Sequence, residues 1–343
     1  MSDKNRKKRI ILAGGGTLGS VSPLLAVAQK YEADYLFIGT KKGPEKDYLK
    51  AQGLENFVTI KSAKWRRYFS WQNFWDFFLL IFAFFQSLKI LLKFKANLVL
   101  TAGSFVAVPV SLAAWFLRVP IIVHQQDVQV GLANKLMAPL AKKITVVFPV
   151  QEKYFSRKKV IVTGNPVRVY IPKEKEEAPC LVITGGGIGA RGLNDFIAPF
   201  IPRLLEKYEI YHILGERNFD QRLDLPSYYP LKFMSEGIID LLAKADIIIS
   251  RAGMSLISEA AALKKALVLV PMPDSHQENN AAYLAKHNAA FMVRQGNYQI
   301  MDRYLDKLLQ KDDLRLALGE NLYQLFPQNA VNDYKILIDK ILK

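Results

Sequence analysis

The chain has 343 residues and a single cysteine, Cys180, so it can form no internal disulfide, and a reducing compartment is indicated. Hydrophobic residues make up 50% of it, which excludes a disordered chain, and its length predicts two domains. The 47 basic residues against 31 acidic ones give a net charge of +16, which indicates a polyanionic partner. Because no zinc-ligand spacing, RNA-binding aromatic motif or helix-turn-helix accompanies this charge, an anionic lipid surface or a phosphorylated substrate is favoured over nucleic acid.

A predicted strand at residues 9–13 runs into a glycine-rich turn and then into a predicted helix at residues 24–31. The apolar part of this strand is too short for a signal peptide. Strand, glycine turn and helix start together form a phosphate-binding element. Residues 14–19 match the dinucleotide fingerprint G-x-G-x-x-G, but the next predicted strand, residues 35–40, ends without the acidic residue that binds a ribose. An NAD-dependent oxidoreductase is therefore disfavoured.

The stretch 65–96 concentrates aromatic residues, including three of the four tryptophans, between lysines and arginines. Its run 74–85 contains Asp76 and is too short to span a bilayer, which predicts an interfacial or a buried helix. Aromatic rings flanked by cations suit the headgroup region of an anionic membrane, and a core helix with basic ends is the alternative. The predicted membrane-contact residues are Trp65, Arg66, Arg67, Phe69, Trp71, Phe74, Trp75, Phe78, Phe82, Phe85 and Lys89.

Further strands are predicted at residues 97–103, 121–127, 144–149 and 160–168. His124 and Asp127 lie at the end of the second of these strands, where open α/β sheets place their site residues. A structural role for the histidine is the alternative. The hydrophilic segment 171–179 predicts a linker that closes a first domain at residues 1–170.

The second half, predicted as a domain at residues 180–328, repeats the architecture, with a glycine turn after its first strand and more strands at 208–216, 245–250 and 266–271. After the last two strands, helices are predicted from Met254 and near Asn279. Strand ends and helix starts at one crevice favour an anion, and polar residues beside them suit sugar hydroxyls. A nucleotide-sugar site is predicted, with an ordinary capped helix as the alternative. Residues 329–343 predict an amphipathic helix that packs back across the domains.

In their order and spacing these motifs resemble, over nearly the whole chain, the MurG-type N-acetylglucosaminyltransferases of glycosyltransferase family 28. The matching segments are GGTLGSVSP (15–23), TAGSFVAVP (101–109), HQQD (124–127), TGNPVR (163–168), GGGIGARGLN (185–194), RAGMSLISE (251–259) and a D-HQ-NA pattern (274–281). The resemblance implies the α/β GT-B fold, two Rossmann-like domains whose parallel sheets face each other across a cleft.

The resemblance also implies the reaction: inverting transfer of GlcNAc from UDP-GlcNAc to the C4 hydroxyl of MurNAc-pentapeptide on undecaprenyl diphosphate, in peptidoglycan synthesis. It implies no metal and no cofactor, and a peripheral place on the cytoplasmic face of the bacterial inner membrane. The sequence holds no D-x-D pair for Mg²⁺, so helix dipoles, backbone N–H groups and Arg168 would stabilise the departing UDP.

Residue roles carried over from the family fall into a donor set and an acceptor set. Met234 would offer its backbone to uracil, Glu259 would bind the ribose, and Met254 and Ser255 would begin the phosphate helix. The remaining donor contacts would come from Gly16, Thr17, Asp127, Arg168, Gly187, His276, Gln277 and Asn280. The loops for the acceptor and its diphosphate would comprise Gly15, Gly16, Thr17, Ser20, Gly103, Ser104 and Phe105.

The chain departs from the family where a base is expected. The family's glycine-loop histidine is Ser20 here, and the HEQN motif reads HQQD, with Gln125 and Asp127 in place of Glu and Asn. Transfer to a hydroxyl needs a proton acceptor, which neither Ser20 nor Gln125 provides at an ordinary pKa. We hypothesise that Asp127, with His124 near it, takes the proton. A silent UDP-sugar-binding membrane scaffold and a GT-B enzyme for another lipid acceptor are the alternatives, and the oligomeric state stays open.

Overall fold

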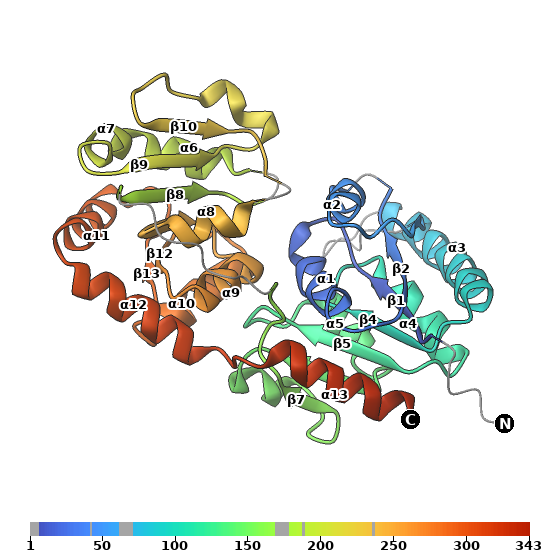
Figure 1. Ribbon diagram of the computed structural model, residues 1–343. Coiled ribbons are helices and arrows are strands. Elements are labelled where there is room, and N and C mark those ends of the chain that lie inside the picture. Colours follow the sequence, from blue (N-terminus) through green and yellow to red (C-terminus); the bar gives the residue numbers. More distant parts are fainter. Residues whose placement is uncertain (1–6, 42, 62–70, 169–177, 187–188, 235–236) are drawn as a thin grey trace. The chain divides into compact units, whose positions relative to one another are not determined.

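The computed structural model describes residues 7–41, 43–61, 71–168, 178–186, 189–234 and 237–343, without the side chains of 71–77 and 221. The chain folds into two compact units (Figure 1). The first comprises residues 1–126, 130–168 and 329–343, and the second comprises 127–129 and 169–328. The second unit thus includes residues 127–129, and the C-terminal segment 329–343, predicted as a separate helix that packs back, groups with the first unit. Most of the predicted linker lies outside the described residues.

The first unit is built on a parallel sheet with the order β3-β2-β1-β4-β5-β6-β7. Its strands are β1 (Arg9–Ala13), β2 (Asp34–Gly39), β3 (Phe57–Thr59), β4 (Leu98–Thr101), β5 (Ile121–Gln125), β6 (Lys143–Val146) and β7 (Val160–Val162). The chain direction across the sheet reverses between β1 and β4. In open α/β sheets ligands bind outside the carboxyl ends of the strands at such a reversal, so the loops after β1 and β4 mark the candidate site.

Helices cover both faces of this sheet, because alternate residues of each strand point to opposite sides. Ile11 of β1 packs into a cluster with residues of α4, whereas Ile10 packs with residues of α1 and with Tyr334 of α13. The helices are α1 (Ser22–Ala28), α2 (Glu45–Ala51), α3 (Trp71–Phe94), α4 (Ala107–Phe116), α5 (Leu132–Met137) and α13 (Ala330–Leu342), with 3₁₀ turns η1 (Leu18–Ser20) and η2 (Pro149–Tyr154).

The second unit has its own parallel sheet, with the order β10-β9-β8-β11-β12-β13 and a reversal between β8 and β11. Its strands are β8 (Cys180–Thr184), β9 (Glu209–Ile213), β10 (Tyr228–Leu231), β11 (Ile247–Ser250), β12 (Ala266–Leu269) and β13 (Phe291–Met292). The two parallel sheets confirm the predicted α/β class with two Rossmann-like folds.

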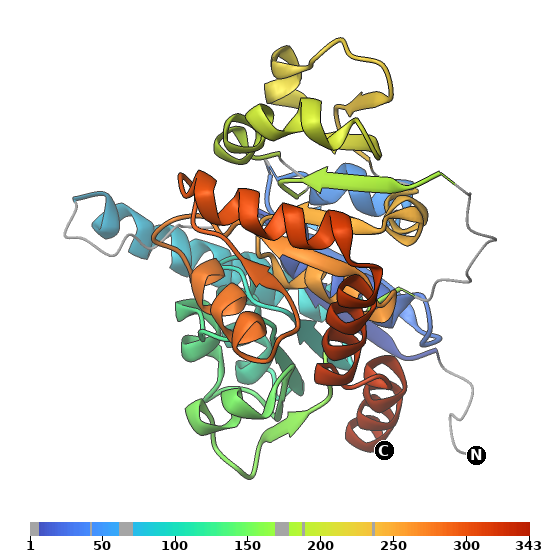
Figure 2. The same cartoon turned by 90° about the vertical axis from the view of Figure 1, so that its left-hand side faces the viewer.

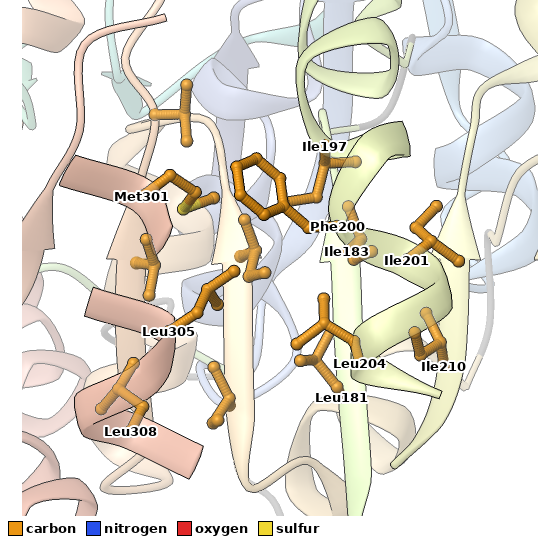
Figure 3. Close-up of a cluster of buried hydrophobic side chains, with 14 of the residues drawn as sticks. Leu181, Ile183, Ile197, Phe200, Ile201, Leu204, Ile210, Met301, Leu305 and Leu308 are labelled. Carbon is orange, nitrogen blue, oxygen red and sulfur yellow. The ribbon is translucent and has the colours of Figure 1, made fainter. Parts of the chain in front are cut away.

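One face of the second sheet is sealed by helices on a shared apolar core. In Figure 3, Leu181 and Ile183 of β8 lie in one cluster with Leu204 of α7 and Leu305 of α11, and all four are buried. Figure 2 shows α11 and α12, in orange to red, as successive helices of this unit. The helices are α6 (Arg191–Ile197), α7 (Ile201–Leu204), α8 (Ile238–Lys244), α9 (Met254–Ala262), α10 (His276–Lys286), α11 (Tyr298–Gln310) and α12 (Asp312–Leu325), with η3 (Ala198–Phe200) and η4 (Glu216–Gln221).

One helix begins earlier than predicted, in a way that affects the site. The helix expected near Asn279 begins at His276, because the Ser275 hydroxyl caps it by accepting from the backbone N–H of Gln277. The aromatic helix α3, Trp71–Phe94, lies within the stretch 65–96 and includes the whole run 74–85. Within the described residues, none of the helices combines the length and the apolar character that crossing a bilayer requires.

Candidate functional site

The first glycine turn follows β1 and is held by a buried carboxylate. Gly15 and Gly16 have φ of +147° and +82°, in the region that favours glycine. Glu45, at the start of α2 and fully buried, accepts from the backbone N–H groups of Gly16 (3.2 Å) and Thr40 (2.6 Å). A Cβ on Gly15 would lie 2.3 Å from Glu45 Oε1. The glycine is therefore required for Glu45 to approach the turn this closely.

Ser20, at the end of the same turn, contributes to its shape. Its Oγ accepts from the backbone N–H of Gly15 at 3.0 Å and donates to the carbonyl of Thr17 at 3.4 Å. Gly16 and Thr17 are exposed and Ser20 is buried. The tip of the turn, Gly16 and Thr17, is therefore exposed. The buried hydroxyl of Ser20, which replaces the family's histidine, holds the turn together by its bond to Gly15.

The loop after β4 lies on the other side of the reversal. Gly103 and Ser104 both have positive φ, +99° and +80°, and for Ser104 this conformation is strained. The backbone N–H of Gly103 donates to Thr101 Oγ1 at 3.2 Å. Ser104 and Phe105 are half-buried just before α4 begins. The predicted acceptor residues therefore follow two adjacent strands, β1 and β4, at one edge of the sheet.

His124, on β5, is fully buried in the first unit. Its Nδ1 lies 3.0 Å from Thr145 Oγ1 and its Nε2 lies 2.8 Å from Asn165 Oδ1. Burial lowers the pKa of His124 to about 4, so the imidazole is neutral at neutral pH. A buried ring with both nitrogens engaged does not fit the predicted role as a proton acceptor beside the substrate. The geometry corresponds to the alternative, a structural histidine.

Gln125 and Arg168 are likewise engaged within the first unit. Gln125 is buried, and its Oε1 accepts from Asn134 Nδ2 at 2.6 Å. The Arg168 guanidinium lies over the ring of Tyr48, 6.0 Å from its centroid, and is 3.5 Å from Gln52 Oε1. Arg168 is thus held against α2, and its predicted contact with a diphosphate stays a prediction.

In the second unit, three predicted residues come together at the start of α10. Asp127 Oδ1 accepts from Asn280 Nδ2 at 2.9 Å, and Asp127 Oδ2 lies 3.7 Å from His276 Nε2. Asn280 is fully buried and also bonds the backbone of Ala252 and Val128. Its amide therefore holds Asp127, and its predicted contact with a sugar stays a prediction. Asp127 and His276 remain partly exposed.

Helix α9 follows β11, one of the two strands at the reversal in the second sheet. Helix α9 begins directly after Gly253, and no side chain of the described residues caps it. Its first-turn N–H groups are suited to an anion. Met254 and Glu259 on this helix are buried and Ser255 is half-buried. The residues predicted to bind the phosphate and the ribose therefore all lie on helix α9.

The other predicted donor residues lie near the remaining strand ends or outside the description. Gln277 Oε1 accepts from the backbone N–H of Met272 at 3.0 Å and so braces the loop after β12. Met234 is half-buried in the loop after β10. Gly187 lies outside the described residues.

Sequence reasoning missed two residues that shape these loops. Glu45 gave no signal beyond an acidic residue in the first turn of a helix. Arg251 follows β11 and donates to the carbonyls of Val270 and Pro271 and to Gln295 Oε1, at 3.0, 3.1 and 2.7 Å. It therefore fixes the chain that leaves β12 to the loop after β13, a long-range contact that no local pattern reveals.

The predicted membrane residues lie partly on one exposed face of α3. Phe78, Phe82 and Phe85 are exposed, the last by 60%, and Lys89 continues the same face. At the adjacent end of α4, Phe116 meets Phe84 edge to face at 6.1 Å. We call Phe78, Ile81, Phe82, Phe85, Trp115 and Phe116, all exposed, the aromatic patch. Trp65, Arg66, Arg67 and Phe69 lie outside the described residues, as do the side chains of Trp71, Phe74 and Trp75.

The arrangement offers backbone donors and helix starts for anions, and it offers Asp127 as a partly exposed carboxylate. In the described part of the chain, no three of His, Cys, Asp and Glu gather as ligands of a metal ion. Binding of a phosphorylated or sugar-bearing ligand by main-chain groups is the chemistry that this geometry supports best.

Comparisons with known proteins agree with this geometry. Residues 10–146 match the glycosyltransferase family 28 N-terminal domain, and residues 180–327 match the C-terminal domain of the same family. A relative from Clostridium tetani, the UDP-N-acetylglucosamine–N-acetylmuramyl-(pentapeptide) pyrophosphoryl-undecaprenol N-acetylglucosamine transferase, is 34% identical over 97% of this chain and 98% of its own length.

Solved structures give the same picture. The crystal structure of MurG from Acinetobacter baumannii matches with a TM-score of 0.74 and 26% identity, over 98% of this chain and 100% of that one. A UDP-GlcNAc 2-epimerase from Neisseria meningitidis, bound to UDP-GlcNAc, matches with a TM-score of 0.70 over 98% of this chain and 100% of its own. At 14% identity the second match concerns the fold alone.

Proposed function

Because the chain belongs to glycosyltransferase family 28, we propose that it transfers GlcNAc from UDP-GlcNAc to the C4 hydroxyl of undecaprenyl-diphospho-MurNAc-pentapeptide. The product would be the disaccharide lipid of peptidoglycan synthesis, formed with inversion and without a metal. The observation that carries this proposal is the 34% identity, over 97% of the chain, to a transferase named for that reaction.

The donor would bind at the carboxyl edge of the second sheet. The diphosphate would lie at the start of α9, where the helix dipole would stabilise negative charge as UDP departs. Met254 and Ser255 begin this helix, and Glu259 lies one turn further on for the ribose. Met234 would offer its backbone to uracil, and His276 and Gln277 would contact the sugar. Arg168 and Gly187 would add to the diphosphate contacts.

The acceptor would bind at the carboxyl edge of the first sheet. The exposed residues Gly16 and Thr17, after β1, and the loop of Gly103, Ser104 and Phe105, after β4, would contact its diphosphate. The aromatic patch would lie in the headgroup region of the membrane that carries the lipid. The protein would then act as a peripheral protein on the cytoplasmic face of the inner membrane.

Asp127 would take the proton of the acceptor hydroxyl. Its carboxylate is partly exposed, and Asn280 and the first turn of α10 hold it in place. His124, whose ring is buried, would act as a positioning residue and not as the proton acceptor. Ser20 and Gln125, which replace the protic residues of the family, form hydrogen bonds that hold their loops.

The test offers the purified protein UDP-GlcNAc and a lipid-linked MurNAc-pentapeptide acceptor, and follows UDP release and disaccharide formation. We expect both products in equal amounts, dependent on the acceptor and insensitive to EDTA. Binding of UDP-GlcNAc without disaccharide would contradict the proposal and favour a silent scaffold. Transfer to a diacylglycerol in place of the isoprenoid acceptor would favour an enzyme for another lipid.

A further inference from the structure

Tyr334 anchors helix α13 to the rest of the first unit through a buried hydrogen bond. It is 1% exposed, and its ring meets that of His124 edge to face, with 5.8 Å between centroids. Its hydroxyl bonds Thr145 Oγ1 on β6, which is also fully buried. A buried phenol needs such a partner, so the contact ties the C-terminal helix to the sheet.

From Thr145 a series of side-chain hydrogen bonds continues to the first glycine turn. Thr145 Oγ1 lies 3.0 Å from His124 Nδ1, and His124 Nε2 lies 2.8 Å from Asn165 Oδ1. Asn165 Nδ2 donates to Gln126 Oε1 at 3.4 Å, and Gln126 Nε2 donates to the carbonyl of Gly19 at 2.9 Å. These residues come from β6, β5 and the segments after β5 and β7, which are far apart in sequence.

The last acceptor, the carbonyl of Gly19, determines which partner donates in every hydrogen bond of this series. A backbone carbonyl can only accept, so Gln126 presents its amide nitrogen to Gly19 and its oxygen to Asn165. Asn165 then presents its oxygen to His124, which must carry its proton on Nε2. Burial keeps the ring neutral, so Nδ1 accepts from the Thr145 hydroxyl, which in turn accepts from Tyr334. All donors therefore point toward the turn.

We propose that α13 sets the shape of the first glycine turn through this series of hydrogen bonds, in which His124 is a neutral positioning residue. Gly19 directly precedes Ser20, whose hydroxyl closes the turn on Gly15, so a shift of Gly19 moves both ends of the turn. The identity of the ligand at the turn rests on the proposed function. The hydrogen-bonded connection between α13 and the turn does not depend on it.

Two pairs of variants test this connection. Thr145→Val keeps the shape and removes the central hydroxyl, whereas Thr145→Ser keeps the hydroxyl and removes a methyl group. Tyr334→Phe removes the first donor of the series. Its matched control is Tyr31→Phe, because the Tyr31 hydroxyl also bonds α13, at Asp339 Oδ1 (2.7 Å), but lies outside the series.

The first readout is the imidazole of His124 in protein labelled with ¹⁵N-histidine, which has only four histidines to assign. We expect a neutral ring protonated on Nε2, and a downfield shift of Nδ1 in Thr145→Val that Thr145→Ser reverses. The second readout is hydrogen exchange of the turn, residues 14–20, which we expect to accelerate in Thr145→Val and in Tyr334→Phe but not in Tyr31→Phe.

The third readout is transfer. We expect kcat/KM for the lipid acceptor to fall by about 5- to 10-fold in Thr145→Val, the effect of one hydrogen bond, with KM for UDP-GlcNAc within about twofold of the wild type. Thr145→Ser should recover most of this loss, and Tyr31→Phe should keep kcat/KM at the wild-type value.

Equal effects of Tyr334→Phe and Tyr31→Phe on exchange of the turn would overturn the proposal, because helix docking alone would then explain them. So would an Nδ1-protonated ring. If Thr145→Val does not fold, Gln126→Met cuts the series at its far end and should alter exchange of the turn without moving the His124 resonances. If no transfer is found, the proposed function fails, while the NMR and exchange results still decide the connection.

Discussion

At the scale of single residues, Asp127 keeps the proton-accepting role predicted for it, and Asn280 has the additional role of holding its carboxylate. Asn280, expected to contact a sugar, is buried and holds Asp127 from α10. Asp127, whose position in the motif belongs to an asparagine in the family, keeps an exposed face. Asn280 therefore positions the charged Asp127. A substitution at Asp127 tests the chemistry more directly than one at Asn280.

Asp127→Asn should lower the turnover number by about 100-fold or more, because an amide cannot accept the proton of the acceptor hydroxyl. The variant keeps a carbonyl oxygen for Asn280, so we expect the KM for UDP-GlcNAc to change little. Steady-state kinetics with both substrates measure the two effects. Asn279→Ala, which removes the neighbouring bond to Gln129, is the control and should keep most of the turnover. Undiminished turnover in Asp127→Asn would remove Asp127 from the mechanism.

His124 and His212 predict how stability depends on pH. Each is buried, and burial lowers each pKa to about 4, from an ordinary value of 6.5. Between pH 6.5 and 4 the unfolded chain therefore binds more protons than the folded one, so stability falls as the pH falls. Each histidine contributes about 3 kcal/mol over this window.

Urea unfolding at pH 7.5, 6 and 5 measures this loss. His124→Gln keeps a donor for Asn165 without a titrating ring, so it should remove about half of the pH dependence below pH 6.5. An unfolding free energy that stays constant from pH 7.5 to 5 would contradict the buried, neutral state of both rings.

At the scale of elements, Glu45 of α2 links that helix to the first glycine turn by accepting from the backbone N–H of Gly16. Gly15→Ala brings a Cβ to 2.3 Å from Glu45 Oε1 and adds strain at a φ of +147°, so we expect a loss of about 2–4 kcal/mol in stability. Gly53→Ala is the matched control: its φ is also positive, +78°, but its Cβ meets no atom of the described residues within 4 Å. It should cost about 1 kcal/mol. Equal losses in thermal or urea unfolding would show that the contact with Glu45 adds nothing.

Helix α3 illustrates where local pattern stops being informative. Its sequence is apolar nearly all round, so periodicity predicts a helix but does not distinguish the buried face from the exposed one. In the structure Ala83, Ser87 and Leu91 form the buried face, and Phe82 and Phe85 are exposed. The small residues let α3 pack closely on the unit, which leaves the large aromatic rings outside. Only the tertiary packing decides this.

At the scale of the whole molecule, the sequence predicts the fold because parallel strands buried on both faces are continuous apolar runs. The glycine turns after β1 and β8 could also be placed, since each follows such a run directly. The polar contacts could not be predicted: Tyr334 bonds Thr145 and Arg251 bonds Gln295 across long stretches of chain. Burial of His124 was equally invisible, because a histidine at a strand end is compatible with both a site and a core.

Charge and the aromatic patch together predict binding to anionic membranes. With a net charge of +16, the protein should bind vesicles that contain phosphatidylglycerol more tightly than neutral ones, and binding should weaken as salt is raised. Phe82 and Phe85 are both exposed on one face of α3, and a lysine, Lys61, lies 5.0 Å from the centroid of the Phe82 ring. Insertion of two phenylalanine rings contributes about 3–6 kcal/mol.

The double variant Phe82→Ser/Phe85→Ser should therefore weaken partitioning into anionic vesicles by about 100-fold or more, measured by co-sedimentation. The control, Leu316→Ser/Ile336→Ser, removes exposed apolar side chains of α12 and α13, outside the patch, and should leave partitioning unchanged. Because the substitutions spare both glycine turns, transfer to a soluble acceptor analogue should persist while transfer in vesicles falls. Equal losses in the two double variants would mean that charge and general hydrophobicity, rather than the aromatic patch, hold the protein at the membrane.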